Sequence, residues 1–134
     1  MKKTLLLLAA LSLTAMAKFT TIDNDTLLKM QAQGVPVIDI RTPGEWKTTG
    51  IIKGAHKMMF FDEKGRPDMG NWFFDLGHLV KDKKQPFIIY CAHANRSKAL
   101  GNFLDKQLKF ENVYELKGGI EHGWIRDGKK PTVK

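Results

Sequence analysis

The chain of 134 residues contains a single cysteine, Cys91. A lone thiol excludes an internal disulfide and any zinc site that needs paired cysteines. The four histidines add no His-x3-His spacing, so we expect no metal and no cofactor. Buried single cysteines often serve only as small core residues, so the role of Cys91 must be judged from its flanking sequence.

Long apolar runs and dense basic runs are also scarce. Beyond residue 17, no stretch approaches the roughly 20 apolar residues that a transmembrane helix needs. The formal charge is +8, or +6 without Lys2 and Lys3, but the basic residues are scattered. This distribution does not indicate a nucleic-acid partner, and it predicts a basic surface that attracts small anions.

The first 17 residues have the three parts of a secretory signal peptide. Lys2 and Lys3 form a basic start, residues 5–13 are apolar, and residues 15–17 (AMA) fit a small-x-small cleavage site. We therefore expect residues 1–17 to be removed, leaving a periplasmic protein that is not inserted in the membrane. The alternative is an N-terminal amphipathic or buried helix. Residues 18–134 have the length of one compact domain.

Predicted strands and helices alternate along this domain. Apolar and β-branched runs predict strands within residues 18–22, 35–40, 51–60, 86–90 and 113–116. Helices are predicted over residues 25–33, 72–79 and 97–110, with a single helical turn within 41–50 and a short helix that ends near residue 124. Such alternation implies right-handed crossovers. It predicts an α/β fold with a five-stranded, mostly parallel sheet flanked by helices on both faces.

Cys91 follows the most apolar of these strands, at the end of a parallel sheet where ligands bind. Four residues, AHAN, separate it from Arg96, and the next helix is predicted to begin at about Ser97. A loop that enters a helix directs several backbone N–H groups toward one point, and the helix dipole adds positive charge. These dipoles and the Arg96 guanidinium favour a thiolate, the nucleophilic form of cysteine. The flanking residues therefore favour a catalytic Cys91.

Four motifs between about Thr20 and Lys130 resemble those of single-domain rhodanese-like proteins. In chain order they are VIDIRTPGEW (Val37 to Trp46), IIKGAH (Ile51 to His56), YCAHANRS (Tyr90 to Ser97) and LKGGIEHGW (Leu116 to Trp124). The resemblance implies a sulfurtransferase in which Cys91 accepts a sulfane sulfur from a small anionic donor, thiosulfate or a persulfide. Cys91 would carry this sulfur as a persulfide and pass it to cyanide or to a thiol, which could belong to a protein.

The resemblance also assigns a substrate-binding loop, whose backbone amides would hold the terminal sulfur and the leaving oxyanion. The loop residues are Ala92, His93, Ala94, Asn95, Arg96 and Ser97. Arg96 could contact the anion, or it could brace the loop by pairing with a carboxylate. His93 and Asn95 could orient the donor or the acceptor, or simply line the rim. Glycine is commoner in the family at the position of Ala94, and alanine is strained there if the position needs a positive φ angle.

Three charged residues near the second predicted strand are expected to support the pocket: Asp39, Arg41 and Glu45. We predict an Arg41–Glu45 ion pair, with Asp39 bonded to nearby backbone. His56 and His122 follow motif turns and could approach the site, whereas no argument places His78 there.

Two other functions fit parts of the pattern. A sulfur carrier or binding module would keep Cys91 but turn over little small donor. Phosphatases of the same fold have a loop one residue longer between cysteine and arginine, which fits a phosphate group. The loop in this chain also lacks an aspartate as general acid, although a residue from elsewhere could serve.

Overall fold

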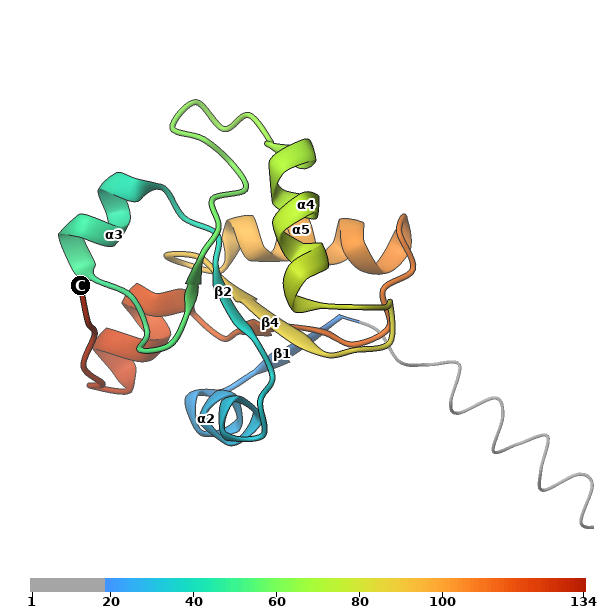
Figure 1. Ribbon diagram of the computed structural model, residues 1–134. Coiled ribbons are helices and arrows are strands. Elements are labelled where there is room, and N and C mark those ends of the chain that lie inside the picture. The colour runs from blue at the N-terminus through green and yellow to red at the C-terminus, as the bar shows by residue number, and fades with distance from the viewer. Residues whose placement is uncertain (1–18) are drawn as a thin grey trace, which may run out of the picture.

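The computed structural model describes residues 19–134, which are drawn in Figure 1. They contain a five-stranded sheet. The strands are β1 (Thr20–Ile22), β2 (Val37–Asp39), β3 (His56–Lys57), β4 (Phe87–Tyr90) and β5 (Val113–Leu116). They lie in the order β1-β5-β4-β2-β3, and every neighbouring pair is parallel. The predicted parallel sheet is therefore confirmed. The predicted signal peptide, residues 1–17, lies outside the described residues.

Helices cover both faces of this sheet, as predicted. They are α2 (Asn24–Ala32), α3 (Pro43–Thr49), α4 (Met69–Leu79), α5 (Asn95–Lys106) and η1 (Gly119–Asp127), the last a π-helix. Figure 1 shows α4 and α5 on one side of the central strands and α2 on the other. No helix within residues 19–134 combines the length and the apolarity needed to cross a membrane.

The central strand β4 is buried on both faces, which explains its unbroken apolar sequence. Phe87 and Ile89 pack with Leu100 and Leu104 of α5 on one face. Ile88 and Tyr90 pack on the other face, in a core cluster that also contains Leu27, Ile120 and Trp124. A strand held in this way fixes the position of the residue that follows it, Cys91.

Some predicted boundaries are wrong. The segment 41–50 forms a helix of about two turns, α3, because Thr42 and Glu45 make a reciprocal capping box and Pro43 suits its first turn. The third strand is only two residues long, and it follows Gly54, whose φ angle is +84°. The helix after the Gly118–Gly119 turn continues to Asp127 instead of ending near Trp124.

Helix α5 begins at Asn95, two residues before the predicted start. Arg96 therefore lies in the first turn of α5 and is not the last loop residue. Ala94 takes the N-cap position with a left-handed backbone and makes no side-chain cap. Since alanine is a poor N-cap, nothing in the residue types marks this start.

Candidate active site

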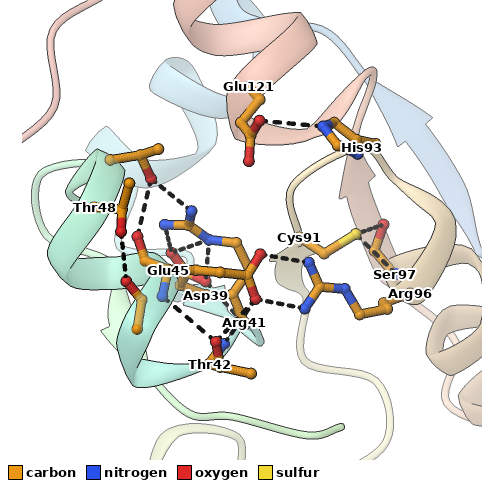
Figure 2. Close-up of polar contacts among 12 residues, drawn as sticks. Asp39, Arg41, Thr42, Glu45, Thr48, Cys91, His93, Arg96, Ser97 and Glu121 are labelled. Atoms are coloured by element: carbon orange, nitrogen blue, oxygen red, sulfur yellow. Dashed lines mark hydrogen bonds and ion pairs between the residues drawn. The ribbon is translucent and has the colours of Figure 1, made fainter. Parts of the chain in front are cut away.

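Cys91 lies immediately after β4, at the carboxyl end of the sheet, and only 1% of its surface is exposed. The Ser97 amide donates a hydrogen bond to Cys91 Sγ at 3.3 Å, and the Ser97 hydroxyl oxygen is 3.7 Å from the same sulfur (Figure 2). The start of α5 therefore directs a backbone dipole at the sulfur, as predicted for the loop. A thiolate at this position is stabilised by the N–H group and by the helix dipole.

The backbone before this helix is held from the opposite side by η1. The amide of Ile120 donates to Cys91 O at 2.9 Å, and the amide of Glu121 donates to Ala92 O at 3.1 Å. Gly119 approaches so closely that a Cβ atom there would collide with these carbonyl groups. The β5–η1 turn thus fixes the first two residues of the active loop.

Ala94 adopts the left-handed conformation, with φ 75° and ψ −5°. The position therefore needs the positive φ angle for which glycine is the usual residue. Alanine pays about 1 kcal/mol or more of strain there. Its methyl group is buried, which offsets part of this strain.

Arg96 braces the loop against α3 (Figure 2). Its guanidinium donates two hydrogen bonds to Glu45, with Nη1–Oε1 at 2.8 Å and Nη2–Oε2 at 2.7 Å. The hydrogen bonds from Arg96 are the largest of the effects that lower the pKa of Glu45 to about 2. Of the two roles foreseen for Arg96, the structure places it in the bracing one.

The predicted Arg41–Glu45 ion pair is wrong. Arg41 instead pairs with Asp39 at 2.8 Å, and both side chains are fully buried. The guanidinium also donates to Thr49 Oγ1 and Gly50 O, so its hydrogen bonds tie the end of β2 to the end of α3. Glu45 is left free to bond Arg96 because Arg41 points into the core under α3. Asp39 and Arg41 thus support the site by joining the end of β2 to the end of α3.

Glu115 is a charged residue of the site that the sequence did not indicate. It lies on β5, is fully buried, and accepts hydrogen bonds from Ser97 Oγ at 2.7 Å and Thr21 Oγ1 at 2.7 Å. Lys98 Nζ forms an ion pair with Oε2 of the Glu115 carboxylate. Glu115 therefore holds the first turn of α5, and with it the Ser97 amide, against the sheet.

The exposed rim of the loop carries His93 and Asn95. His93 Nε2 lies 3.2 Å from Glu121 Oε1, and its ring stacks on His122 with the ring centroids 4.3 Å apart. His122 therefore approaches the loop, as its motif position suggested. His56 does not, because it lines a separate groove of about 880 Å³ together with His78.

A second groove, of about 630 Å³, runs beside the loop between α3 and α5. Its walls include Arg96, Glu45, Asn95, Phe61 and Ala99. Among residues 19–134, no three His, Cys, Asp or Glu side chains gather closely enough to hold a metal ion. The arrangement offers a buried thiol, a backbone amide directed at its sulfur and a neighbouring groove that is large enough for a second reactant.

Relatives in sequence include two bacterial enzymes that are each named thiosulfate sulfurtransferase GlpE. The chain is 30% identical to that of Pseudomonas entomophila over 106 residues, which cover 79% of this chain and 85% of the relative. It is 26% identical to that of Pseudomonas fluorescens over 106 residues, which again cover 79% of this chain and 85% of the relative. A tRNA uridine(34) hydroxylase from Onion yellows phytoplasma is 41% identical over 67 residues. That match covers 50% of this chain but only 20% of the hydroxylase.

Two solved structures share the fold. A rhodanese-related protein from Thermoplasma volcanium has a TM-score of 0.57 at 23% identity, and the match covers 81% of this chain and 93% of that protein. A Rhodopseudomonas palustris protein of unknown function, described as a possible tyrosine phosphatase, has a TM-score of 0.54 at 26% identity. That match covers 89% of this chain and 86% of the other.

The family model for the rhodanese-like domain matches residues 23–126. This range includes every strand except β1, together with the Cys91 loop and the residues that brace it. The chain therefore belongs to the rhodanese-like domain family.

Proposed function

We propose that this protein is a sulfurtransferase that moves a sulfane sulfur from thiosulfate or a related donor to a thiol through a persulfide on Cys91. The observation that carries the proposal is the contact between the Ser97 amide and Cys91 Sγ at 3.3 Å, inside a loop with four residues before Arg96. Thiosulfate sulfurtransferases among the relatives support the same reaction.

The first half-reaction forms one bond and breaks one. The Cys91 thiolate attacks the outer sulfur of thiosulfate and forms an S–S bond. The bond between that sulfur and the sulfonate group breaks, and its electron pair leaves with sulfite. Cys91 is then a persulfide anion, and total charge is conserved.

The chain supplies electrostatic stabilisation for this step. The terminal sulfur and the leaving oxyanion would face the first-turn amides of α5, which have no acceptor within the helix. The ion pair between Arg96 and Glu45 keeps these amides in place. Because the Glu45 carboxylate offsets much of the positive charge of Arg96, that charge acts only weakly on the sulfur. We therefore assign a positioning role to Arg96 and a direct contact with the nucleophile to Ser97.

In the second half-reaction, an acceptor thiolate attacks the outer persulfide sulfur and releases Cys91 as thiolate. The groove between α3 and α5 borders the loop and provides room for such an acceptor. The acceptor proposed for this groove is a thiol, which could belong to a small molecule or to a protein.

Two alternatives give different results in solution. A sulfur carrier would accept sulfur on Cys91 but release it too slowly for turnover. A phosphatase, the activity suggested for the Rhodopseudomonas palustris protein, would hydrolyse an aryl phosphate. The shorter loop of this chain favours a single sulfur over a phosphate group.

The test is steady-state thiocyanate formation from thiosulfate and cyanide by residues 18–134, with Cys91→Ser as the control. We expect turnover in the wild type and none in the variant. Aryl phosphate hydrolysis that depends on Cys91, without thiocyanate formation, would replace the proposal with the phosphatase alternative. Persulfide formation without turnover on any acceptor would favour the carrier.

A further inference from the structure

The strongly charged side chains around Cys91 are paired. Three ion pairs surround the loop: Arg96 with Glu45, Lys98 with Glu115, and Arg41 with Asp39. Each pair joins a strong base to a carboxylate, so each stays close to neutral over the pH range in which most proteins work. A donor anion that reaches the loop therefore meets backbone amides but little net side-chain charge.

Two histidines at the rim provide a charge that can change. His93 is the second residue after Cys91, and its ring stacks on that of His122 at 4.3 Å, with 24° between the ring planes. His93 also contacts Glu121, and both of these side chains are more than a third exposed. Figure 2 shows His93 and Glu121 on the opposite side of Cys91 from the Arg96–Glu45 pair. The cluster therefore lies at the rim of the loop, where His93 is only two residues from Cys91.

The cluster of His93, His122 and Glu121 has two main charge states. With both rings neutral, it carries the negative charge of the Glu121 carboxylate. The first proton to bind a ring cancels this charge, and protonated His93 then donates to Glu121. A second proton is opposed by the first because the two rings are in contact. Imidazoles change charge between about pH 5 and about pH 8.

The other strongly charged side chains near the cluster are held in ion pairs. Asp127 lies on the same helix as His122, and the hydrogen bond that it accepts from Arg126 holds the pKa of Asp127 below its usual value. The ion pairs of α3, α5, β2 and β5 are those named above.

We infer that the cluster of His93, His122 and Glu121 selects sulfur donors by their charge, so that dianionic donors gain on monoanionic donors as the pH falls. This inference rests on the proposed sulfurtransferase activity. At higher pH, the Glu121 carboxylate repels the additional charge of a dianion. At lower pH the cluster carries no net charge, so it no longer repels the dianion. The cluster thereby determines specificity without touching the bonds that form and break.

The test compares two donors that differ by one charge and react in the same way. Thiosulfate is a dianion, and methanethiosulfonate is a monoanion of similar shape. Each gives the same Cys91 persulfide, with sulfite or methanesulfinate as the leaving group. Rates of persulfide formation are measured by rapid quench and intact mass from about pH 8 to about pH 5.5. Because both donors need the same thiolate, the ratio of their rates cancels the titration of Cys91.

In the wild type, the ratio of the thiosulfate rate to the methanethiosulfonate rate should rise about threefold or more as the pH falls. The ratio should stay nearly constant in the double variant His93→Gln, His122→Gln, and Glu121→Gln should already have a raised ratio at about pH 8. His78→Gln, at an exposed position on α4, is the matched control and should follow the wild type. A flat wild-type ratio, or an unchanged pH dependence in the variant that lacks both histidines, would overturn the inference. Failure of both donors to load Cys91 would instead reject the sulfurtransferase proposal.

Discussion

At the scale of single residues, the sulfur of Cys91 is held by a chain of contacts that ends at the surface. Ser97 contacts the sulfur, Glu115 holds Ser97, and Lys98 neutralises Glu115. From the sequence, Cys91 and Ser97 could be placed together at the candidate site because both belong to the YCAHANRS motif. Glu115 could not, since one acidic residue within a short strand reads as a solvent-facing position until α5 is packed above it.

Ala94 provides a test of the backbone conformation of the loop. Replacement by glycine removes about 1 kcal/mol of left-handed strain but also removes a buried methyl worth about 0.8 kcal/mol. We therefore expect Ala94→Gly to change the free energy of unfolding by less than about 0.5 kcal/mol, measured by urea denaturation. Ala99→Gly, at an exposed position inside α5, should cost about 1 kcal/mol. Equal losses in the two variants would contradict the assigned conformation of Ala94.

Glu45 links stability to pH. The pKa of Glu45 in the folded protein is about 2, below its usual value of 4.5, chiefly because Arg96 donates to it. A lowered pKa means that the pair stabilises the fold above pH 4.5 and loses this contribution as the pH falls toward about 2. Because both side chains are partly exposed, we expect Glu45→Gln to lose about 1–2 kcal/mol at neutral pH.

The difference between the wild type and Glu45→Gln should close as the pH is lowered toward about 2, in urea denaturation at a series of pH values. Glu63→Gln is the control, because Glu63 is exposed and borders the same groove without bonding Arg96. A pH-independent gap, or an equal gap in both variants, would show that the Arg96 pair does not stabilise the loop.

At the scale of elements, the active loop is clamped between α5 and η1. The amides at the start of η1 bond the carbonyl groups of Cys91 and Ala92. The sequence indicated a short helix after β5, but not the length or the π-helical form of η1. It also could not reveal that Glu45 bonds Arg96, because this pair depends on the pairing of β2 with β4, the strands that precede α3 and α5.

Gly119 tests this clamp. Its φ angle is 68°, and an added Cβ would lie 2.6 Å from Cys91 O. We expect Gly119→Ala to lose about 2 kcal/mol or more of unfolding free energy, from strain and from steric overlap. Persulfide formation should slow by about tenfold or more, because the loop amides are displaced from the sulfur.

Gly77→Ala is the matched control for Gly119→Ala. Gly77 lies in α4 with open space around its Cα, so alanine there should stabilise the helix by about 0.5–1 kcal/mol. Denaturation in urea and the rate of persulfide formation are compared for the two variants. If Gly119→Ala kept the wild-type rate of persulfide formation, the proposed clamp would not control the loop.

At the scale of the whole molecule, alternation of strands and helices was sufficient to predict the parallel sheet and its helical layers. The buried run of β4 also located Cys91 at the carboxyl end of the sheet. Boundaries were less accurate, because β3 is short and α5 begins at a residue with no capping side chain. Local sequence therefore predicted the architecture and the position of Cys91 at the end of β4, whereas the ion pairs required the assembled fold.

We propose that residues 1–17 direct export to the periplasm. Expression of the full chain in a Gram-negative bacterium should yield a periplasmic protein that begins at Lys18, as determined by N-terminal sequencing of the fractionated protein. Substitution of two leucines in the apolar segment by aspartate should retain the protein in the cytoplasm with its first residues intact. Wild-type protein that stays in the cytoplasm and keeps Met1 would contradict the proposal.

The central claim is that Cys91 carries the transferred sulfur. Its most direct test is the intact mass of residues 18–134 after brief exposure to thiosulfate, with Cys91→Ser as the control. The account predicts a gain of one sulfur atom in the wild type, no gain in the variant, and loss of the added sulfur when a thiol acceptor follows. An unchanged wild-type mass with every sulfane donor, or an equal gain in Cys91→Ser, would contradict it.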